Sequence, residues 1–213
     1  LVNKRYINIV DGRVGYLKSE TKETIDLILS TEVKEIKEKV FKDNIDVNLL
    51  YVPNTVEKIS SDAFAGVSFK EIVFDANIDM IDSLFVNNEL EKITNTNKIK
   101  TVKGQTFENA KIKEVNYLGS IQDLASTVYF TYYDAPNHNE NCKLYIYGVP
   151  VQTIEVPEGV TLIREYTFMN YSNIEKIKLP STLECMGPSA FVGSGVKEIV
   201  YNGTKEMWDK VQK

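Results

Sequence analysis

The sequence predicts a β-rich repeat solenoid, and three observations support this prediction. Phenylalanines recur at a nearly constant spacing, an apolar alternation ending in proline precedes several of them, and the charges before these strands alternate in sign. A period of roughly 20–50 residues is typical of solenoids, because one such unit cannot bury its apolar face alone and neighbours must stack. We therefore expect one strand per repeat of about 22 residues and one core that runs along the stack.

The spacing of the phenylalanines defines the repeat. Intervals of 21 to 23 residues separate the members of two sets, Phe41, Phe64, Phe85 and Phe107, and then Phe168 and Phe191. In "IEKIKLPSTLECMGPSAF", Ile177 and Leu179 are two residues apart, which is the period of a strand. Pro180 then ends the strand because it has no N–H to donate. We expect about eight such units, several of them degenerate, separated by short turns or helical pieces.

The two residues before each core Ile or Val form a charge pattern. They are Lys70-Glu71, Glu91-Lys92, Lys113-Glu114, Gln152-Thr153, Glu175-Lys176 and Lys197-Glu198. If the strands are parallel and in register, most neighbours in each column carry opposite charges, and each opposite pair adds roughly 0.2–1 kcal/mol to strand pairing. We interpret the pattern as a device that fixes register. A charged groove for a charged ligand is the weaker interpretation, because the signs cancel.

The two ends of the chain predict covering elements. Residues 6–17 alternate like a hairpin around Asp11-Gly12, a strong two-residue turn signal. At the other end Thr204 can N-cap a short helix, with Trp208 on its apolar stripe. We expect residues 1–213 to form a single solenoid domain, divided into an N-terminal cap (1–24), a first repeat block (25–125), an aromatic insertion (126–148) and a second repeat block with the C-terminal helix (149–213).

Composition excludes several classes of protein. The chain has 213 residues, 25 Lys+Arg against 30 Asp+Glu and a net charge of -5, which gives no electrostatic footprint for nucleic acid. No run of about 18 apolar residues is present, so we expect no membrane insertion within this chain. With one His and two Cys, a His-based catalytic site would depend on a single residue. We expect Cys142 and Cys185 to be free or buried thiols, although their pairing stays open.

Several motifs resemble those of a known family. "VPNTVEKISSDAF", "VPEGVTLIREYTF" and "LPSTLECMGPSAF" are similar to the unit of the BspA-type leucine-rich repeat, also called the Treponema pallidum type. "YLGSIQDL", "YNGTKEMW" and "LYIYG" resemble the blocks that commonly separate its repeat arrays, although Leu124 stands where Trp is usual. The resemblance implies a curved, right-handed leucine-rich-repeat array. It also implies a secreted or cell-surface protein, from a largely bacterial family with exported members in unicellular eukaryotic parasites, that acts in adhesion or protein binding.

Candidates for chemistry are weak. His138 and Cys142 are four residues apart and could form a nucleophilic pair, but no third residue to orient them is evident. Asp134, His138 and Glu140 could approach a metal, but their spacing matches no ligand rule. We therefore expect no catalytic residue, no metal site and no cofactor. An enzyme with chemistry in the insertion is the least favoured hypothesis.

The aromatic insertion is the best candidate for a binding surface. Tyrosine is enriched at recognition sites because it offers a large and rigid contact area. The alternative is that these rings pack the insertion against the solenoid. A second candidate is an exposed column of strand residues comprising Tyr51, Val73, Thr94, Asn116, Glu155, Lys178 and Val200. The predicted binding residues are Tyr129, Tyr132, Tyr133, Tyr145 and Tyr147 of the insertion, together with Tyr51.

These observations favour a non-enzymatic, monomeric module, extracellular or on the cell surface, that binds a protein or glycan partner. A structural spacer or accessory domain of a larger exported protein is the alternative.

Overall fold

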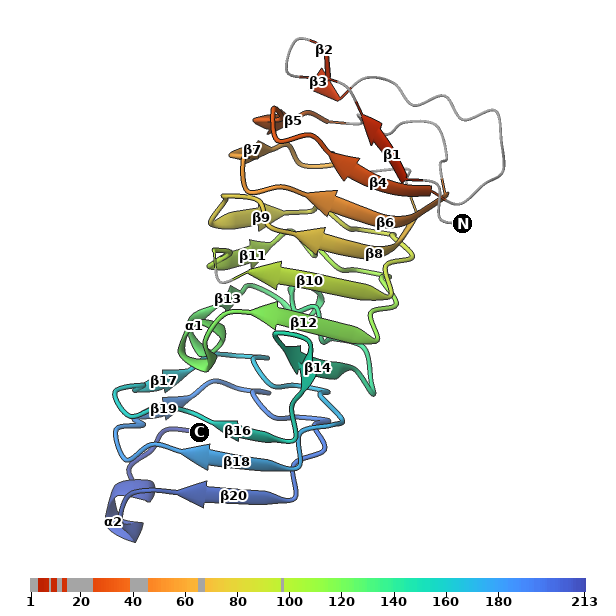
Figure 1. Ribbon diagram of the computed structural model, residues 1–213. Coiled ribbons are helices and arrows are strands. Elements are labelled where there is room, and N and C mark those ends of the chain that lie inside the picture. The colour runs from red at the N-terminus through yellow and green to blue at the C-terminus, as the bar shows by residue number, and fades with distance from the viewer. Residues whose placement is uncertain are drawn as a thin grey trace.

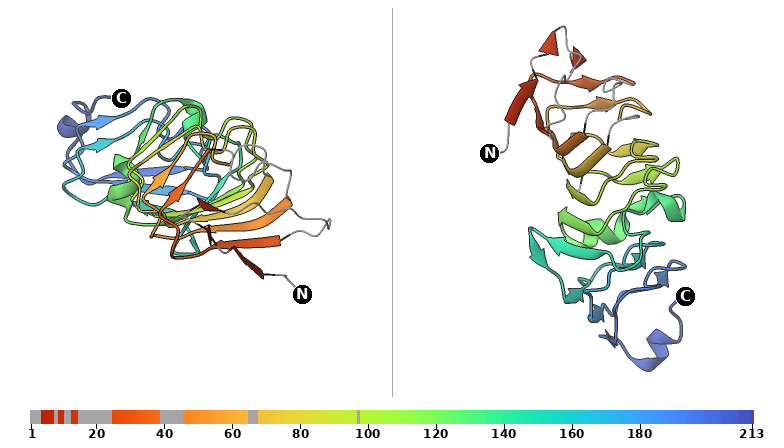
Figure 2. Two further views of the ribbon diagram at one scale, coloured as in Figure 1. Left: turned by 90° about the horizontal axis from the view of Figure 1, so that it is seen from above. Right: turned by 90° about the vertical axis from the view of Figure 1, so that its right-hand side faces the viewer.

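The protein is a solenoid of stacked coils, seen in a computed structural model that describes residues 4–7, 9–10, 13–14, 25–38, 46–64, 68–96 and 98–213. Figure 1 shows long strands stacked along one side of the molecule and short strands along the other. The two further views in Figure 2 show the same elongated stack from above and from the side. The predicted repeat phenylalanine Phe41 and the predicted turn at Asp11-Gly12 lie outside the described residues.

One long sheet carries most of the molecule. Its seven parallel strands are β1 (Lys4–Ile7), β4 (Ile25–Leu29), β6 (Asp46–Val52), β8 (Ser68–Phe74), β10 (Lys92–Thr96), β12 (Glu114–Leu118) and β14 (Lys143–Ile146). The eighth strand, β15 (Val149–Pro150), is antiparallel and ends the sheet. A separate parallel sheet of β16 (Thr153–Glu155), β18 (Lys176–Leu179) and β20 (Glu198–Tyr201) continues the stack. One long strand per coil confirms the predicted fold.

A second layer of short strands faces the long ones across the core. It consists of the pair β5 (Glu35–Ile36) and β7 (Lys58–Ile59), the trio β9 (Met80–Asp82), β11 (Thr101–Lys103) and β13 (Val128–Tyr129), and the pair β17 (Leu162–Ile163) and β19 (Cys185–Met186). Most of these strands fall where two apolar residues stand three apart after the proline position, as Val56 and Ile59 or Leu183 and Met186 do. They become strands because equivalent segments of successive coils lie parallel and in register.

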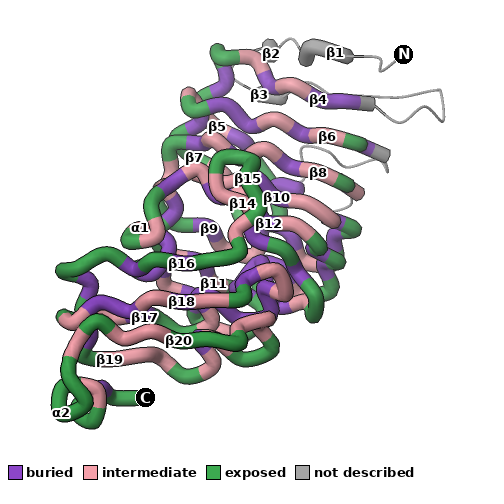
Figure 3. The backbone as a smooth tube through the Cα atoms, turned by 60° about the horizontal axis from the view of Figure 1, so that its bottom comes forward, coloured by how far each residue is buried: buried purple, intermediate pink, exposed green. Residues whose placement is uncertain are grey.

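Stacked phenylalanines fill the space between the two layers. The Phe85 ring lies 5.5 Å from those of Phe64 and Phe107, and the three rings are nearly parallel. Phe168 and Phe191 repeat the arrangement at 5.6 Å. The predicted role of the repeat phenylalanine is therefore confirmed at the described positions. Figure 3 shows the inward residues as buried bands that recur from coil to coil.

The predicted charge ladder is present. The register pairs Lys92 with Glu71 on one side and with Glu114 on the other. Among the described residues of this ladder, four ion pairs join neighbouring coils, namely Glu71–Lys92 at 3.1 Å, Glu91–Lys113 at 2.8 Å, Glu175–Lys197 at 3.3 Å and Lys176–Glu198 at 2.7 Å. Each pair is partly exposed, so its contribution to stability is small, and its main effect is to disfavour a shifted register.

The N-terminal elements differ in part from expectation. β2 (Ile9–Val10) and β3 (Arg13–Val14) pair antiparallel, as predicted for a hairpin. Ile7 does not belong to it, because residues 4–7 form β1 and extend the long sheet beside β4. The hairpin prediction was therefore too long at its N-terminal side.

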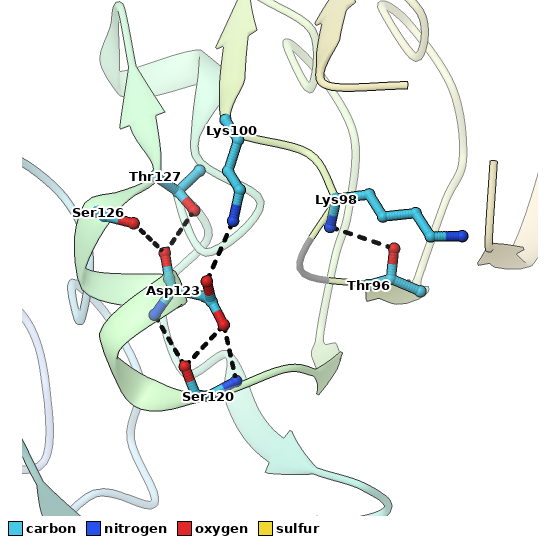
Figure 4. A network of polar contacts seen from close by, with 7 residues as sticks. All are labelled: Thr96, Lys98, Lys100, Ser120, Asp123, Ser126 and Thr127. Atoms are coloured by element: carbon cyan, nitrogen blue, oxygen red, sulfur yellow. Dashed lines mark hydrogen bonds and ion pairs between the residues drawn. The ribbon is translucent and has the colours of Figure 1, made fainter. Parts of the chain in front are cut away.

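Two short helices close the coils that follow β12 and β20. In α1 (Ile121–Ser126), the Ser120 Oγ accepts the Asp123 N–H at 3.1 Å and donates to Asp123 Oδ2 at 2.7 Å. Asp123 also pairs with Lys100 at 3.1 Å, which attaches the helix to the coil before it (Figure 4). In α2 (Lys205–Trp208) the predicted N-cap Thr204 accepts the N–H of Met207, which confirms the C-terminal helix.

Residues 126–148, predicted as an insertion, follow the path of the solenoid. β13 pairs with β11 and β14 pairs with β12, so the segment completes one enlarged coil. The extra length lies between these strands and includes the 3-10 turn Tyr132–Asp134. The long sheet then stops, because the chain reverses at Tyr147-Gly148 and β15 covers the end of β14.

Side-chain amides join the two sheets where the strand ladder is interrupted. The Asn173 Oδ1 accepts the Leu144 N–H at 2.9 Å, while its Nδ2 donates to the carbonyls of Leu144 at 2.8 Å and Val151 at 2.9 Å. Asn137 Nδ2 donates to the carbonyls of Tyr166 at 2.9 Å and Met169 at 2.7 Å. Asn173 thus supplies both a donor and an acceptor, as a neighbouring strand would.

Candidate functional site

The predicted column on the long sheet is the first part of the candidate site, but it is less exposed than expected. Thr94 is only 7% exposed, and Tyr51, Val73 and Asn116 are half-buried. The register aligns Tyr51 with Val73, Val73 with Thr94, and Thr94 with Asn116. Tyr145 lies beside Asn116 as the next member. We call these five residues the uncharged column. Sequence reasoning placed Tyr145 in the insertion instead, because the enlarged coil hides the 22-residue period at this point.

A hairpin continues the uncharged column with a more exposed tyrosine. Tyr147 and Gly148 form the turn between β14 and β15, with φ values of 50° and 78°. The Gly148 N–H donates to Asn116 Oδ1 at 2.8 Å, and the Tyr147 N–H donates to the Tyr117 carbonyl at 3.2 Å. Tyr147 is 67% exposed, and Figure 3 shows the turn as an exposed segment. A bulky residue at positive φ costs free energy that these hydrogen bonds help to offset.

Tyr132 and Tyr133 form a second, separate aromatic group. Their rings lie 5.3 Å apart edge to face, and each lies 5.9 Å from the His138 ring. The Tyr132 hydroxyl donates to the His138 carbonyl. Both side chains are about two-fifths exposed, at 39% and 41%. They lie on the loop that returns from the short-strand layer to the long sheet, so the structure does not bring them into one cluster with Tyr145 and Tyr147.

Tyr129 does not fit the predicted binding group. It is only 7% exposed and belongs to the core, where β13 pairs with β11. Burial raises the pKa of its phenol well above the usual value. The interpretation of Tyr129 as a surface residue was wrong. No repeat motif marks Val128–Tyr129 as the next strand of the short-strand layer.

The environment of Tyr51 is more polar than that of Tyr129. Partial burial raises the pKa of the Tyr51 phenol, and the Asp75 carboxylate, which accepts its hydrogen bond, raises it further. Tyr51 therefore keeps its proton at neutral pH and donates it in a hydrogen bond to Asp75.

The residues considered for catalysis do not form a reactive pair. Cys142 is fully buried, and burial raises the pKa of its thiol to about 12, so it is protonated at neutral pH. The His138 Nδ1 lies 3.1 Å from the Ala135 carbonyl and its Nε2 lies 3.1 Å from Asn139 Nδ2. Burial lowers the pKa of His138, so the ring is neutral at neutral pH, and its two nitrogens are engaged in these local contacts. Both cysteines are free thiols.

Of the three residues considered for metal binding, Asp134 and His138 are engaged in hydrogen bonds and Glu140 is exposed. Asp134 is fully buried, and its carboxylate accepts the Thr106 N–H at 2.9 Å and both the N–H and hydroxyl of Thr131 at 2.9 Å. It holds the enlarged coil against the coil before it. Sequence reasoning gave Asp134 only a ligand role and missed this structural one, since its partners are 28 and 3 residues away.

A hollow of about 600 Å³ lies on the short-strand side, where β13 and β17 do not pair. Its lining includes the exposed ring of Phe130 together with Arg164 and Met186. No sequence signal marked this hollow, because it arises from the interruption between the two blocks.

The stacked coils with one long strand each define a leucine-rich-repeat solenoid. Residues 19–135 and 137–210 match the family described as BspA type Leucine rich repeat region, in six copies. The chain therefore belongs to this family, as the motifs indicated. No curated protein matches the sequence.

Three solved structures are similar to the chain at low identity. A leucine rich cell surface protein from Faecalibacterium prausnitzii A2-165 is 18% identical, with 88% of this chain and 56% of that one covered and a TM-score of 0.40. The pneumococcal vaccine antigen PcpA is 17% identical, with 92% of this chain and 56% of that one covered and a TM-score of 0.42. A leucine-rich repeat protein from Eubacterium ventriosum ATCC 27560 is 12% identical, with 84% of this chain and 60% of that one covered and a TM-score of 0.37. The chain spans little more than half the length of each. Within the described ranges, no helix is long and apolar enough to cross a membrane.

Proposed function

We propose that this chain is a non-enzymatic binding module, secreted or on a cell surface, that recognises an extracellular protein or glycan. The recognition surface in this proposal is the uncharged column together with the hairpin tip at Tyr147. Tyr132 and Tyr133 form a second patch that a partner would reach from the side of the coil. The extracellular location rests on the family resemblance.

The exposed ring of Tyr147 carries the proposal. Hydrogen bonds to the Asn116 side chain and to the Tyr117 carbonyl fix the turn that carries Tyr147. Binding therefore costs little backbone conformational entropy at this position. Tyrosine adds only two side-chain torsions while offering a large amphipathic surface. Beside it, the uncharged column gives a surface without net charge, flanked by charges that already pair within the protein.

A structural spacer is the second candidate function. Ion pairs between successive coils occupy many of the surface charges, including Lys58 with Glu35 and Lys178 with Glu155. A surface whose charges are matched internally suits a rod that holds other domains apart. This alternative predicts that no surface tyrosine is needed for any interaction.

Alanine substitution of the exposed tyrosines separates the two candidates. The probes are arrays of purified extracellular matrix proteins and of glycans, with binding measured for the native chain, Tyr147→Ala and the pair Tyr132→Ala with Tyr133→Ala. We expect Tyr147→Ala to weaken binding at least tenfold, as for a central aromatic contact. Phe130→Ala, which removes an equally exposed ring on the short-strand side, is the matched control.

Hydrogen exchange and circular dichroism would verify that each variant keeps its fold. Binding that survives both tyrosine changes in folded protein would exclude these surfaces. Absence of binding to every probe by the native chain would favour the spacer.

A further inference from the structure

His138 is the only histidine of the chain, and it lies at the junction between the two blocks. Its residue is 6% exposed, on the loop between β13 and β14. Its backbone carbonyl accepts hydrogen bonds from the Tyr132 hydroxyl and from Asn170 Nδ2, the latter at 2.9 Å. His138 therefore connects the exposed tyrosine pair with a coil of the second block.

The hydrogen bonds of the ring define one neutral tautomer. Nδ1 lies 3.1 Å from the Ala135 carbonyl, which can only accept, so Nδ1 carries the proton. Nε2 is then an acceptor, and Asn139 Nδ2 lies 3.1 Å from it. The same Nδ2 also donates to the Ala110 carbonyl at 3.0 Å. Asn139 thus uses one amide proton for the ring and the other for the coil before it.

A second proton on the ring is incompatible with this arrangement. In the imidazolium form the Nε2–H would face the amide donor of Asn139. A half turn of the amide would let its oxygen accept the new proton, but that oxygen would then lie against the Ala110 carbonyl. Protonation therefore breaks the contact between this loop and the coil before it, or drives the ring from its buried position.

The groups that face the ring from the neighbouring elements are neutral. The Tyr132 and Tyr133 rings lie 5.9 Å away, and the coil of the second block contributes the amide of Asn170. Burial lowers the pKa of His138, and the hydrogen bond to the Ala135 carbonyl opposes that shift only in part.

The charged groups nearby are engaged elsewhere or exposed. The Asp134 carboxylate accepts three hydrogen bonds from other residues of the two coils, and Glu140 is exposed. In the coil before, Lys111 pairs with Glu89 at 3.7 Å. Proton uptake by the ring is therefore not offset by a carboxylate partner.

We propose that His138 is a proton-sensitive latch, which holds the loop of residues 131–142 and its tyrosine pair in place when neutral and releases them when protonated. The proposal rests on the proposed function in one respect, namely that Tyr132 and Tyr133 belong to the recognition surface. Its consequence is a binding patch that is ordered near neutral pH and loosened in mildly acidic surroundings.

The direction of the effect follows from proton linkage. The pKa of His138 is lowered in the latched loop and returns toward its ordinary value of 6.5 in a released one. The released loop therefore takes up the proton first as the pH falls. Latching is complete above about pH 6.5 and weakens from there down to the lowered pKa, by up to about tenfold in the release equilibrium per pH unit.

NMR and hydrogen exchange on the whole chain test the latch without any partner. A single histidine gives one set of imidazole signals, and we expect its titration to fall below pH 6.5. The Phe107 and His138 amides bond to carbonyls of the loop, so their exchange, corrected for the intrinsic rate, should accelerate between about pH 7.5 and 5.5. The Cys185 amide, bonded to the Thr161 carbonyl in the second block, is the internal reference and should not change.

Two substitutions separate a latch from a merely structural residue. His138→Gln cannot titrate, so the acceleration of exchange in acid should disappear. Asn139→Asp replaces the donor beside Nε2 by an acceptor, so it should raise the pKa of His138 relative to the native chain and strengthen latching as the pH falls. Glu140→Gln removes an exposed carboxylate from the same loop and is the matched control, which should behave like the native chain.

A native His138 pKa at or above 6.5 would overturn the latch, as would loop exchange with the same pH dependence in the native chain and in His138→Gln. Binding to the matrix-protein and glycan probes at the two pH values tests the link to function. Weaker binding in acid for the native chain, but not for His138→Gln, supports both proposals. Release of the loop with unchanged binding would overturn the tyrosine pair as the regulated surface. Release without binding to any probe would support the latch and contradict the proposed function.

Discussion

The junction between the two sheets depends on Asn173, and its replacement by alanine gives the most direct test of that arrangement. Three hydrogen bonds would be lost, to the Leu144 N–H and to the carbonyls of Leu144 and Val151. Each such bond contributes about 0.5–1.5 kcal/mol net. We therefore expect Asn173→Ala to lower the free energy of unfolding by about 2–4 kcal/mol, and the melting temperature by about 5–12 °C for a chain of this size.

Urea unfolding followed by circular dichroism, together with calorimetry, would measure the change. Asn202→Ala is the control, because Asn202 is exposed and its side chain donates one long hydrogen bond, 3.4 Å to Glu158. Asn173→Asp sharpens the test, since a carboxylate still accepts the Leu144 N–H but faces two carbonyls without a proton. It should destabilise at least as much at neutral pH and recover in part as the pH falls and the carboxyl group protonates. A loss of less than 0.5 kcal/mol (about the effect of an ordinary surface change) for Asn173→Ala would refute the reasoning.

Three further predictions concern the core, the charge ladder and a buried thiol. Phe85→Ala, which interrupts the ring stack, should destabilise by about 3–5 kcal/mol in urea unfolding, whereas Phe130→Ala should change stability little; equal effects would contradict the stack. The hydrogen bond from Lys113 holds the pKa of Glu91 below its usual value. The stabilisation of the fold by this ion pair is therefore present above about pH 4.5 and is lost as the pH falls through the lowered pKa. In an NMR titration, Lys113→Ala should return the Glu91 pKa toward its ordinary value. Cys142, with a pKa of about 12, should resist a thiol reagent at pH 8 in native protein and react once urea unfolds the chain; rapid native labelling of Cys142 would show that the coil opens.

The sequence predicted best the features that depend on signals within one repeat or between adjacent repeats. Pro180 and the Ile177/Leu179 alternation fix a strand and its end, and the opposite charges of Glu71 and Lys92 fix the register with the next strand. These signals act over one or two repeats, so period and alternation revealed them. The position of Thr94 in the uncharged column followed directly from this register.

Features that depend on distant partners were not predictable in this way. Tyr129 looked like part of an aromatic surface, but its burial follows from pairing with a strand 27 residues earlier. Asp134 and Asn173 carry no motif, because their partners are backbone groups of other coils. The placement of Tyr145 beside Asn116 required knowing that one coil is longer than the rest.

The interrupted sheet has a mechanical consequence. Within each block, consecutive long strands share a continuous backbone ladder, which spreads a load over several bonds at once. Between the blocks, the side-chain amides of Asn137 and Asn173 and isolated backbone hydrogen bonds, such as that from the Ser172 N–H to the Cys142 carbonyl, take the place of the ladder. When the rod is pulled along its axis, extension should therefore begin at this junction, which makes it a compliant joint between two stiffer segments.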